Sequence, residues 1–220
     1  MKKDKTSIVL LLDRSGSMEQ LKTDVVGGVN SFIADQKKLP GEADFTLVQF
    51  DDQYELNYKN KTLKDVSDLT LDTYIPRGMT ALLDAFGKTI NEFGAGLASL
   101  VDSERPEKVI FVLFSDGLEN SSKEFTYEKI TEMVNHQREK YKWSFIFLGS
   151  NMDAIKEASK FGITKNHSIT YSASPIGTSS VYHATSNLVG AMRCCSVNST
   201  EDLSFSDEDR KNQEELLKKQ

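Results

Sequence analysis

Cysteine, proline and long apolar runs are scarce in this chain of 220 residues. The only two cysteines, Cys194 and Cys195, are adjacent, which excludes a disulfide framework because neighbouring cysteines rarely bond without strain. Four prolines and thirteen glycines leave no room for a low-complexity linker. The apolar run at residues 8–12 is too short for a signal peptide, and no apolar stretch is long enough to cross a membrane. These absences predict a cytoplasmic protein whose cysteines stay reduced.

Basic charge is also in deficit. The chain has 27 lysines and arginines against 33 aspartates and glutamates, a net charge of −6. This balance argues against nonspecific nucleic-acid binding, which needs a basic surface to replace the counterions of the phosphates. The expected partners therefore include neither nucleic acid nor a membrane.

Apolar runs alternate along the chain with segments of helical periodicity. Residues 7–13 form a continuous apolar run, typical of a strand that is buried on both faces of a parallel sheet. Further strands are predicted at residues 45–50, 54–58, 108–114, 143–148 and 168–171. Helices are predicted at residues 18–39, 80–100, 125–142, 152–161 and 174–195. The alternation predicts a doubly wound α/β fold with helices on both faces of a mostly parallel sheet of about six strands, in which residues 54–58 form an antiparallel edge strand.

The end of the chain differs in composition from the rest. Residues 196–220 carry seven acids and four bases, and Ser206 with Asp209 resembles a capping box before a short polar helix. We therefore divide the chain into a domain at residues 1–195 and a charged tail at residues 196–220. The tail is expected either to be solvated or to dock through its four apolar residues, Leu203, Phe205, Leu216 and Leu217.

Oxygen-bearing side chains follow two of the predicted strands and begin one of the predicted helices. Asp13, Ser15 and Ser17 come after the first strand at alternate positions, so an extended turn directs them to one point. Thr80 begins a helix, and Asp116 follows the strand at residues 108–114. Ligands bind beyond the C-terminal ends of parallel strands, so all five side chains are expected at one edge of the sheet.

The chemistry of these donors predicts a divalent cation. Two carboxylates and three hydroxyls form a hard, all-oxygen set, which favours Mg²⁺ or Mn²⁺ over Zn²⁺. Two carboxylates neutralise such an ion, and neutral hydroxyls leave it able to attract a further carboxylate from a partner. The alternative is that these residues are helix caps and turn residues, where Ser, Thr, Asp and Gly are common.

The pattern Asp13-x-Ser15-x-Ser17, with Thr80 and Asp116-Gly117 downstream, resembles the metal-ion-dependent adhesion site of von Willebrand factor type A domains. The order and strand context of the segments match over roughly residues 5–195, and all five positions are filled. The resemblance implies that Ser15, Ser17 and Thr80 bind the ion through hydroxyls, and that Asp13 and Asp116 bind it directly or through water. It also implies Mg²⁺, with Mn²⁺ or Ca²⁺ as alternatives, and a protein partner that presents Glu or Asp.

The chain resembles stand-alone intracellular type A proteins of bacteria and phages more closely than it resembles animal adhesion domains, and some of those proteins work beside AAA+ ATPases. The leading hypothesis is a Mg²⁺-dependent protein-binding module rather than an enzyme. One alternative is a metal-stabilised structural subunit of a larger assembly, for example with an AAA+ ATPase. Another is a Mg²⁺-dependent phosphatase, although Ser15 stands two residues after Asp13, where such chemistry uses a second acid.

Other polar residues flank these segments. Asp51 and Asp52 follow a strand and are expected in an exposed turn. Arg14 and Arg77 are expected either to be solvated or to attract an acidic group of a partner. Residues 119–122 extend the loop after Asp116 and either set specificity or form an ordinary polar loop.

Overall fold

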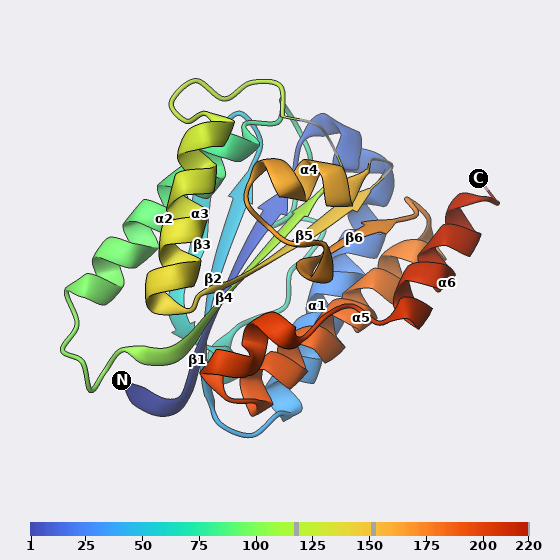
Figure 1. Cartoon of the computed structure of the whole chain (residues 1–220). Helices are drawn as coiled ribbons and strands as arrows, with labels where there is room; N and C mark the ends of the chain where they lie inside the picture. Colours follow the sequence, from blue (N-terminus) through green and yellow to red (C-terminus); the bar gives the residue numbers. More distant parts are fainter. Residues whose placement is uncertain (117–118, 151–152, 220) are drawn as a thin grey trace.

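The computed structural model describes residues 1–116, 119–150 and 153–219, and Figure 1 shows how its helices surround one central sheet. The strands are β1 (Lys2–Asp13), β2 (Glu42–Phe50), β3 (Tyr54–Thr62), β4 (Pro106–Ser115), β5 (Ser144–Ser150) and β6 (Ser168–Tyr171). The α-helices are α1 (Lys22–Lys38), α2 (Leu82–Ala98), α3 (Tyr127–Tyr141), α4 (Ala154–Lys160), α5 (Pro175–Cys194) and α6 (Asp207–Leu217). Short 3₁₀ helices cover Gly16–Leu21, Leu63–Asp65, Lys165–His167 and Val197–Asp202.

The sheet has six strands in the order β3-β2-β1-β4-β5-β6. Every pair is parallel except the edge pair, in which β3 runs antiparallel to β2. This confirms the predicted α/β fold, including the antiparallel edge strand. The chain moves outward from β1 to β2 and β3, and then crosses to β4 on the other side of β1. The strand order therefore reverses between β1 and β4, which is where ligands bind in sheets of this kind.

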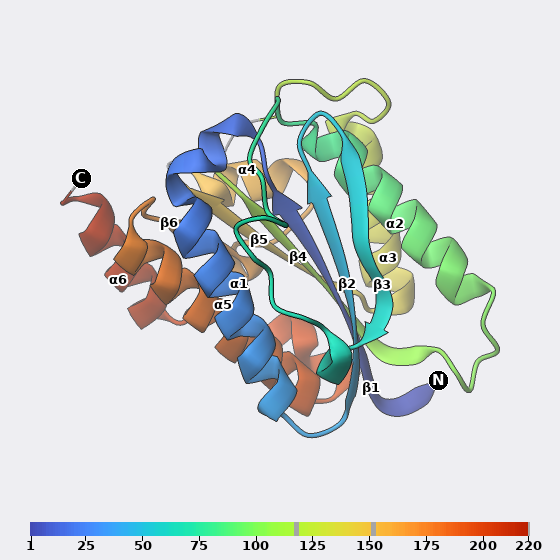
Figure 2. The same ribbon diagram turned by 180° about the vertical axis from the view of Figure 1, so that it is seen from behind.

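Helices cover both faces of the sheet, which explains why its central strands are apolar throughout (Figures 1 and 2). Along β1, Ile8, Leu10 and Leu12 belong to the core beneath α1 and α5. Val9 and Leu11 point the other way, into the core beneath α2, α3 and α4. From Thr6 onward, neither face of β1 is exposed to water, so the residue that ends this strand, Asp13, lies in the interior of the molecule.

The predicted elements are all present, but several boundaries differ. The central strands begin earlier than their apolar runs, because polar residues such as Lys5 and Glu42 still pair across the sheet. The first helix begins later, at Lys22, because a 3₁₀ helix covers Gly16–Leu21. The helix expected at residues 152–161 is seen as α4, and its expected first residue, Met152, lies outside the described residues.

The tail packs against the rest of the molecule. Phe205 is buried in the core, and Leu203 packs against that core, whereas Leu216 and Leu217 are half-buried. Ser206 and Asp209 form the expected capping box at the start of α6. Within the described part of the chain, no helix is both long and apolar enough to span a membrane. The division of the chain at residue 195 stays a prediction.

Gln213 anchors α6 to the end of β6. It is only 2% exposed, accepts a hydrogen bond from the Ser172 amide at 3.0 Å and donates one to the Gly177 carbonyl at 3.0 Å. Arg210 donates to the carbonyl of Ser168 at 2.8 Å. These side chains therefore bind backbone groups at the two ends of β6 and at the start of α5, and so fix α6 beside the last strand of the sheet.

Candidate metal site

Asp13 is the last residue of β1 and lies between the ends of β2 and β4. Its side chain is fully buried, with Oδ1 accepting the Ser15 amide at 2.7 Å and Oδ2 accepting the Ser115 hydroxyl. Burial raises the pKa of Asp13 to about 6, because loss of water disfavours the charged form. The hydrogen bonds from Ser115 and Ser15 offset only part of this effect. The buried end of β1 therefore places the Asp13 carboxylate out of reach of water, which disfavours its ionised form.

A chain of hydrogen bonds joins Asp13 to Asp116. Ser15, whose amide binds Asp13, has its hydroxyl oxygen 3.1 Å from that of Ser17. The Ser17 hydroxyl in turn donates to Oδ1 of Asp116 at 2.7 Å. Burial also raises the pKa of Asp116, and the hydrogen bond from Ser17 opposes this rise. Four of the five predicted ligands thus lie within one hydrogen-bonded cluster.

Thr80, the fifth predicted ligand, is buried at the start of the α2 region, and its segment packs against the turn after β1. The Gly16 amide donates to the Gly78 carbonyl at 3.2 Å, which ties the two segments together. Gly78 has a positive φ of 66°, a conformation that side chains disfavour. Thr80 therefore lies at the same edge of the sheet as Asp13. Gly117, the last residue of the predicted motif, lies outside the described residues.

Asn120 holds Thr80 in place, a role that the sequence did not reveal. The Thr80 amide donates to Oδ1 of Asn120 at 2.9 Å, and the Asn120 amide donates to the Thr80 carbonyl at 3.1 Å. In the same loop, Glu119 accepts the Leu83 amide at 3.0 Å. The polar loop at residues 119–122 thus positions the beginning of α2, which favours the structural interpretation of this loop.

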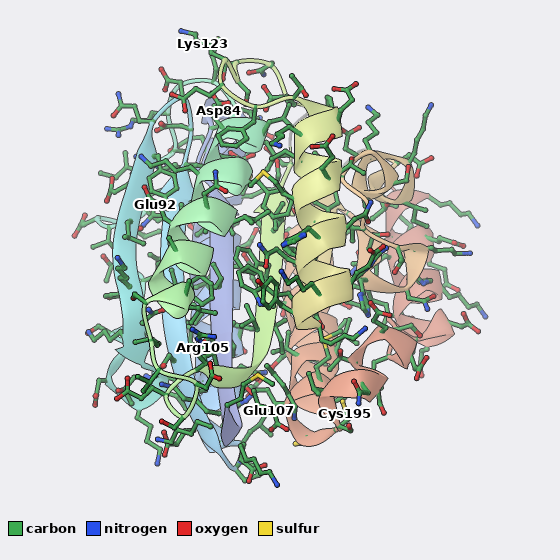
Figure 3. The ribbon with its side chains drawn as sticks, turned by 60° about the vertical axis from the view of Figure 1, so that its left-hand side comes forward. Asp84, Glu92, Arg105, Glu107, Lys123 and Cys195 are labelled. Carbon is green, nitrogen blue, oxygen red and sulfur yellow. The ribbon has the colours of Figure 1, made fainter. Side chains whose placement is uncertain are left out.

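Asp84, in the first turn of α2, binds the same loop a few residues further along the chain. Its carboxylate accepts the amides of Lys123, Glu124 and Phe125 at 2.7 to 2.9 Å. Figure 3 shows Asp84 and Lys123 together at one pole of the molecule. An acid in the first turn of a helix is a common signal of a helix start, but the sequence cannot say which loop such an acid binds.

A second buried aspartate lies beside the site. Asp51 follows β2 and is fully buried, so the expectation of an exposed turn is wrong for this residue. Its Oδ2 accepts Nε of Arg14 at 3.1 Å and Nε of Arg77 at 2.8 Å. Arg14 is itself buried and also pairs with Glu55, so it is not solvated, whereas the Arg77 side chain is half-exposed. Paired guanidinium groups neutralise this carboxylate and cover it from water.

The donors at the site fit a divalent cation. Among the described residues, Asp13 and Asp116 are in no ion pair, and every hydrogen bond that reaches their carboxylates comes from a neutral group. Buried carboxylates usually have a counterion, a metal or a shifted pKa. Within the same described part of the chain, no three acidic, histidine or cysteine side chains come together as a cluster. Any cation held here depends on hydroxyls beside the two carboxylates, and the assignment of the five ligands stays a prediction.

No protein-family model matches the sequence, and no curated protein sequence matches it. Solved structures do share its fold. Proximal thread matrix protein 1 from the mussel byssus is 15% identical with a TM-score of 0.60, over 84% of this chain and 46% of that one. The chain thus spans less than half of the mussel protein. Another structure of that protein, 17% identical, has a zinc-occupied metal-ion-dependent adhesion site.

Two bacterial structures are similar over comparable lengths. The von Willebrand factor domain of the pili tip protein Mfa5 from Porphyromonas gingivalis is 11% identical with a TM-score of 0.60, and the match covers 85% of this chain and 95% of that domain. The pilus adhesin SpaC from Lactobacillus rhamnosus GG, in its open conformation, is 12% identical with a TM-score of 0.64, over 86% of this chain and 30% of that one. At these identities the likeness concerns the fold alone. The chain has the α/β fold of von Willebrand factor type A domains.

Proposed function

We propose that this chain is a divalent-metal-dependent protein-binding module and not an enzyme. The observation that carries the proposal is the Asp13 carboxylate, which is fully buried and hydrogen-bonded to neutral donors. Burial without a cation raises the pKa of this carboxyl, because loss of water disfavours its charged form. A bound cation removes that cost, since an opposite charge close by favours the ionised form.

Five side chains would hold the ion: Asp13, Ser15, Ser17, Thr80 and Asp116. Asp13 and Asp116 supply two negative charges, and the three hydroxyls supply neutral oxygens. Mg²⁺ suits this hard donor set best, and Mn²⁺ or Ca²⁺ are compatible with it. When bound, the ion would supply an open coordination position for a carboxylate oxygen of a protein partner. Asn120 and Asp84 keep the Thr80 segment in place for this role.

The fold neighbours support a binding role for this site. One is named as a pilus adhesin, and one carries zinc at a site of the same name as the one that the motif resembles. A partner that presents Glu or Asp, a complex with an AAA+ ATPase and a cytoplasmic location are further predictions of the sequence resemblance. The alternative of a structural subunit differs in one respect: its partner would bind whether or not the ion is present.

Calorimetric titration of Mg²⁺ into protein stripped of metal tests the site. The wild type is expected to bind one ion, whereas Asp13→Asn and Thr80→Ala are expected to lose at least tenfold in affinity. The exposed Asp72→Asn is the matched control and should bind as the wild type does. Wild-type affinity in folded Asp13→Asn would contradict the ligand assignment.

An affinity pull-down from the native host tests the partner. It is run in Mg²⁺, in EDTA and with Thr80→Ala. A partner that is retained in Mg²⁺ and lost in the other two conditions supports binding through the ion. If a partner is retained in all three conditions, its interface does not include the ion, and this result supports the structural-subunit alternative.

A further inference from the structure

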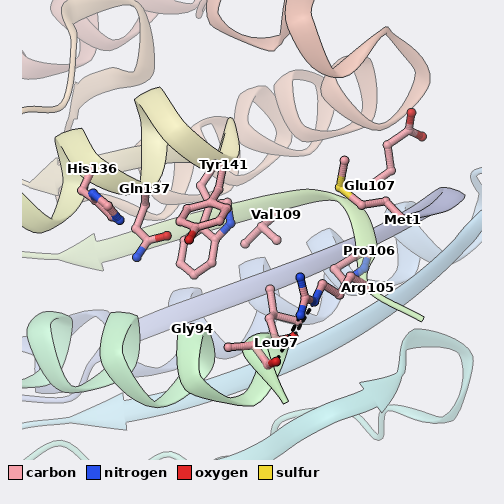
Figure 4. A pocket seen from close by; sticks show the side chains of 12 residues that line it. Met1, Gly94, Leu97, Arg105, Pro106, Glu107, Val109, His136, Gln137 and Tyr141 are labelled. Atoms are coloured by element: carbon pink, nitrogen blue, oxygen red, sulfur yellow. Dashed lines mark hydrogen bonds between the residues drawn. The ribbon is translucent and has the colours of Figure 1, made fainter. Parts of the chain in front are cut away.

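A cavity of about 370 Å³ lies between α2 and α3, at the N-terminal ends of β4 and β5 (Figure 4). Leu97 of α2 and Tyr141 of α3 line opposite sides, and the buried Val109 and Trp143 form part of its apolar lining. Figure 3 places Arg105, which also lines the cavity, at the pole opposite Asp84. The cavity is therefore remote from the candidate metal site.

We propose that this cavity binds a neutral, flat, largely apolar small molecule that carries one hydrogen-bonding group. Its volume falls in the range of about 300–1,000 Å³ that is typical of ligand pockets. Such pockets combine apolar walls with a few polar groups that fix the orientation of the ligand. The aromatic side chains Trp143 and Tyr141 suit a flat ring system.

The charges around the cavity are few and of both signs, so they favour no strongly charged ligand. Arg105 and His136 are the basic side chains among the described lining residues, and Met1, which carries the terminal ammonium group, lines the cavity as well. The guanidinium of Arg105 pairs with Asp102 at 2.8 Å and donates to backbone carbonyls at the end of α2, including that of Leu97 at 2.9 Å. The carboxylate of Glu107 accepts the Asp4 amide at 3.0 Å and extends toward the end of the cavity away from Tyr141 (Figure 4). The guanidinium of Arg105 is therefore paired, whereas the carboxylate of Glu107 keeps its charge and is opposite in sign to the terminal ammonium of Met1, which also lines the cavity.

Of the three polar side chains with which α3 lines the cavity (His136, Gln137 and Tyr141), Gln137 places its carboxamide nearest to Gly94. Its Nε2 lies 3.9 Å from the position that a Cβ at Gly94 would take across the gap, and it is half-buried. Among the residues that the structure describes, this carboxamide has no hydrogen-bonding partner, whereas the backbone carbonyl of Gln137 accepts the Trp143 amide at 3.3 Å. A half-buried amide without a partner is suited to bind a carbonyl or hydroxyl of a ligand.

Gly94 lies within α2 and lines the cavity, and because it has no side chain it leaves this space unfilled. Glycine is a weaker helix former than every residue except proline, yet a Cβ at this position would meet only ordinary contacts, the nearest with Trp143 at 3.6 Å. Packing therefore does not require a glycine here. A larger side chain at this position would project into the cavity between Trp143 and Gln137.

Titration with prodan, a neutral naphthalene dye with one carbonyl group, tests this proposal. Trp143 is the only tryptophan in the chain, so quenching of its emission reports bound dye, and the variants at positions 94, 96 and 137 tell whether that dye lies in the cavity. The wild type is expected to bind one dye saturably, in Mg²⁺ and in EDTA alike. Gly94→Leu should weaken binding at least tenfold, and Gln137→Leu about threefold, because it removes the hydrogen bond but keeps the apolar wall.

Gly96→Leu is the matched control. It makes the same substitution in the same helix, but a Cβ at Gly96 meets nothing within 4 Å and Gly96 does not line the cavity. Gly96→Leu is expected to bind prodan as the wild type does. The proposal is overturned if the wild type shows no saturable binding, or if Gly94→Leu, shown to be folded by circular dichroism, binds as tightly as Gly96→Leu. A failure of Mg²⁺ binding elsewhere leaves this result unaffected.

Discussion

Asp13 at the end of β1 and Asp51 directly after β2 are both fully buried, but their carboxylates have different hydrogen-bonding partners. Asp13 closes β1 and receives only neutral donors among the described residues, whereas Asp51 follows β2 and receives two guanidinium groups. Arg14 is next to Asp13 in the sequence but binds Asp51, because adjacent side chains of an extended segment point to opposite sides. The comparison teaches that burial alone does not assign a role to a carboxylate. The charges that reach it decide whether it is neutralised by the fold or left to bind a cation.

Asp51→Asn is expected to have the largest effect on stability. It keeps the shape of the side chain but leaves the buried guanidinium of Arg14 with only the half-exposed Glu55 as a charged partner. Breaking a buried ion pair on one side typically costs about 3–5 kcal/mol, and the remaining pair with Glu55 places the expected loss near 3 kcal/mol. Urea unfolding measures it, with the exposed neighbour Asp52→Asn as the control. Equal stability of the two variants would show that Asp51 is not the anchor of this cluster.

Asp13→Asn is expected to change stability in the opposite direction when metal is absent. The pKa of Asp13 is about 6 in the folded chain against an ordinary value of 3.8, a difference that corresponds to a cost of about 3 kcal/mol at pH 7. Asparagine removes this cost but requires the Ser115 hydroxyl to reverse its hydrogen bond, so a gain of about 2 kcal/mol is expected. Urea unfolding in EDTA measures the gain.

The same unfolding experiment in Mg²⁺ compares how the wild type and Asp13→Asn respond to the ion. The wild type should become more stable as the ion binds the folded state, whereas Asp13→Asn should not respond. A variant that is less stable than the wild type in EDTA would show that the Asp13 carboxylate contributes to the fold as Asp51 does. The contrast between the two aspartates would then fail.

The gain in Asp13→Asn should depend on pH. A pKa that is raised in the folded state means that the folded chain binds more protons than the unfolded chain between about pH 4 and pH 6. The protonated Asp13 therefore contributes stability that is complete below about pH 4 and is lost as the pH rises through 6. In EDTA, the advantage of Asp13→Asn should shrink by about 1.4 kcal/mol between pH 7 and pH 5, and it should be gone by about pH 4. A difference that is constant from pH 7 to 5 would contradict the raised pKa.

The sequence predicts much of this fold because its signals are local. Alternating apolar runs and helical periodicity identify the strands β1 to β6 and the helices α1 to α5, and a capping box indicates α6, whereas the 3₁₀ helices have no such signal. The order of these elements requires a sheet that places Asp13 and Asp116 at one edge. The motif at Asp13, Ser15 and Ser17 is local as well, so these candidates could be named before the structure. What the sequence hides is which distant side chain meets which.

Three contacts illustrate this limit. Asp51 and Arg14 are 37 positions apart, and Thr80 and Asn120 are 40 apart, so neither pair has a local signature. Gln213 belongs to a polar helix whose composition fits a solvated tail equally well, yet it is buried against the end of β6. In each case the partner is set by the packing of whole elements, which residue type and spacing do not determine.

Arg77→Ala is expected to have the smallest effect, and it tests how Asp51 is neutralised. Arg77 donates to Asp51 at 2.8 Å and to Gln53 at 3.1 Å, but its side chain is half-exposed, so solvent screens the pair. The hydrogen bond to Asp51 raises the pKa of Arg77, which shows the direction of the interaction. Because Arg14 remains beside Asp51, the melting temperature is expected to fall by no more than about 2 °C. Differential scanning calorimetry measures the fall beside that of Arg14→Ala, which removes the buried partner and should cost several times more. If the two variants lose equal stability, burial of the cation does not matter, and the difference between Asp51 and Asp13 lies in the number of charges rather than in their depth.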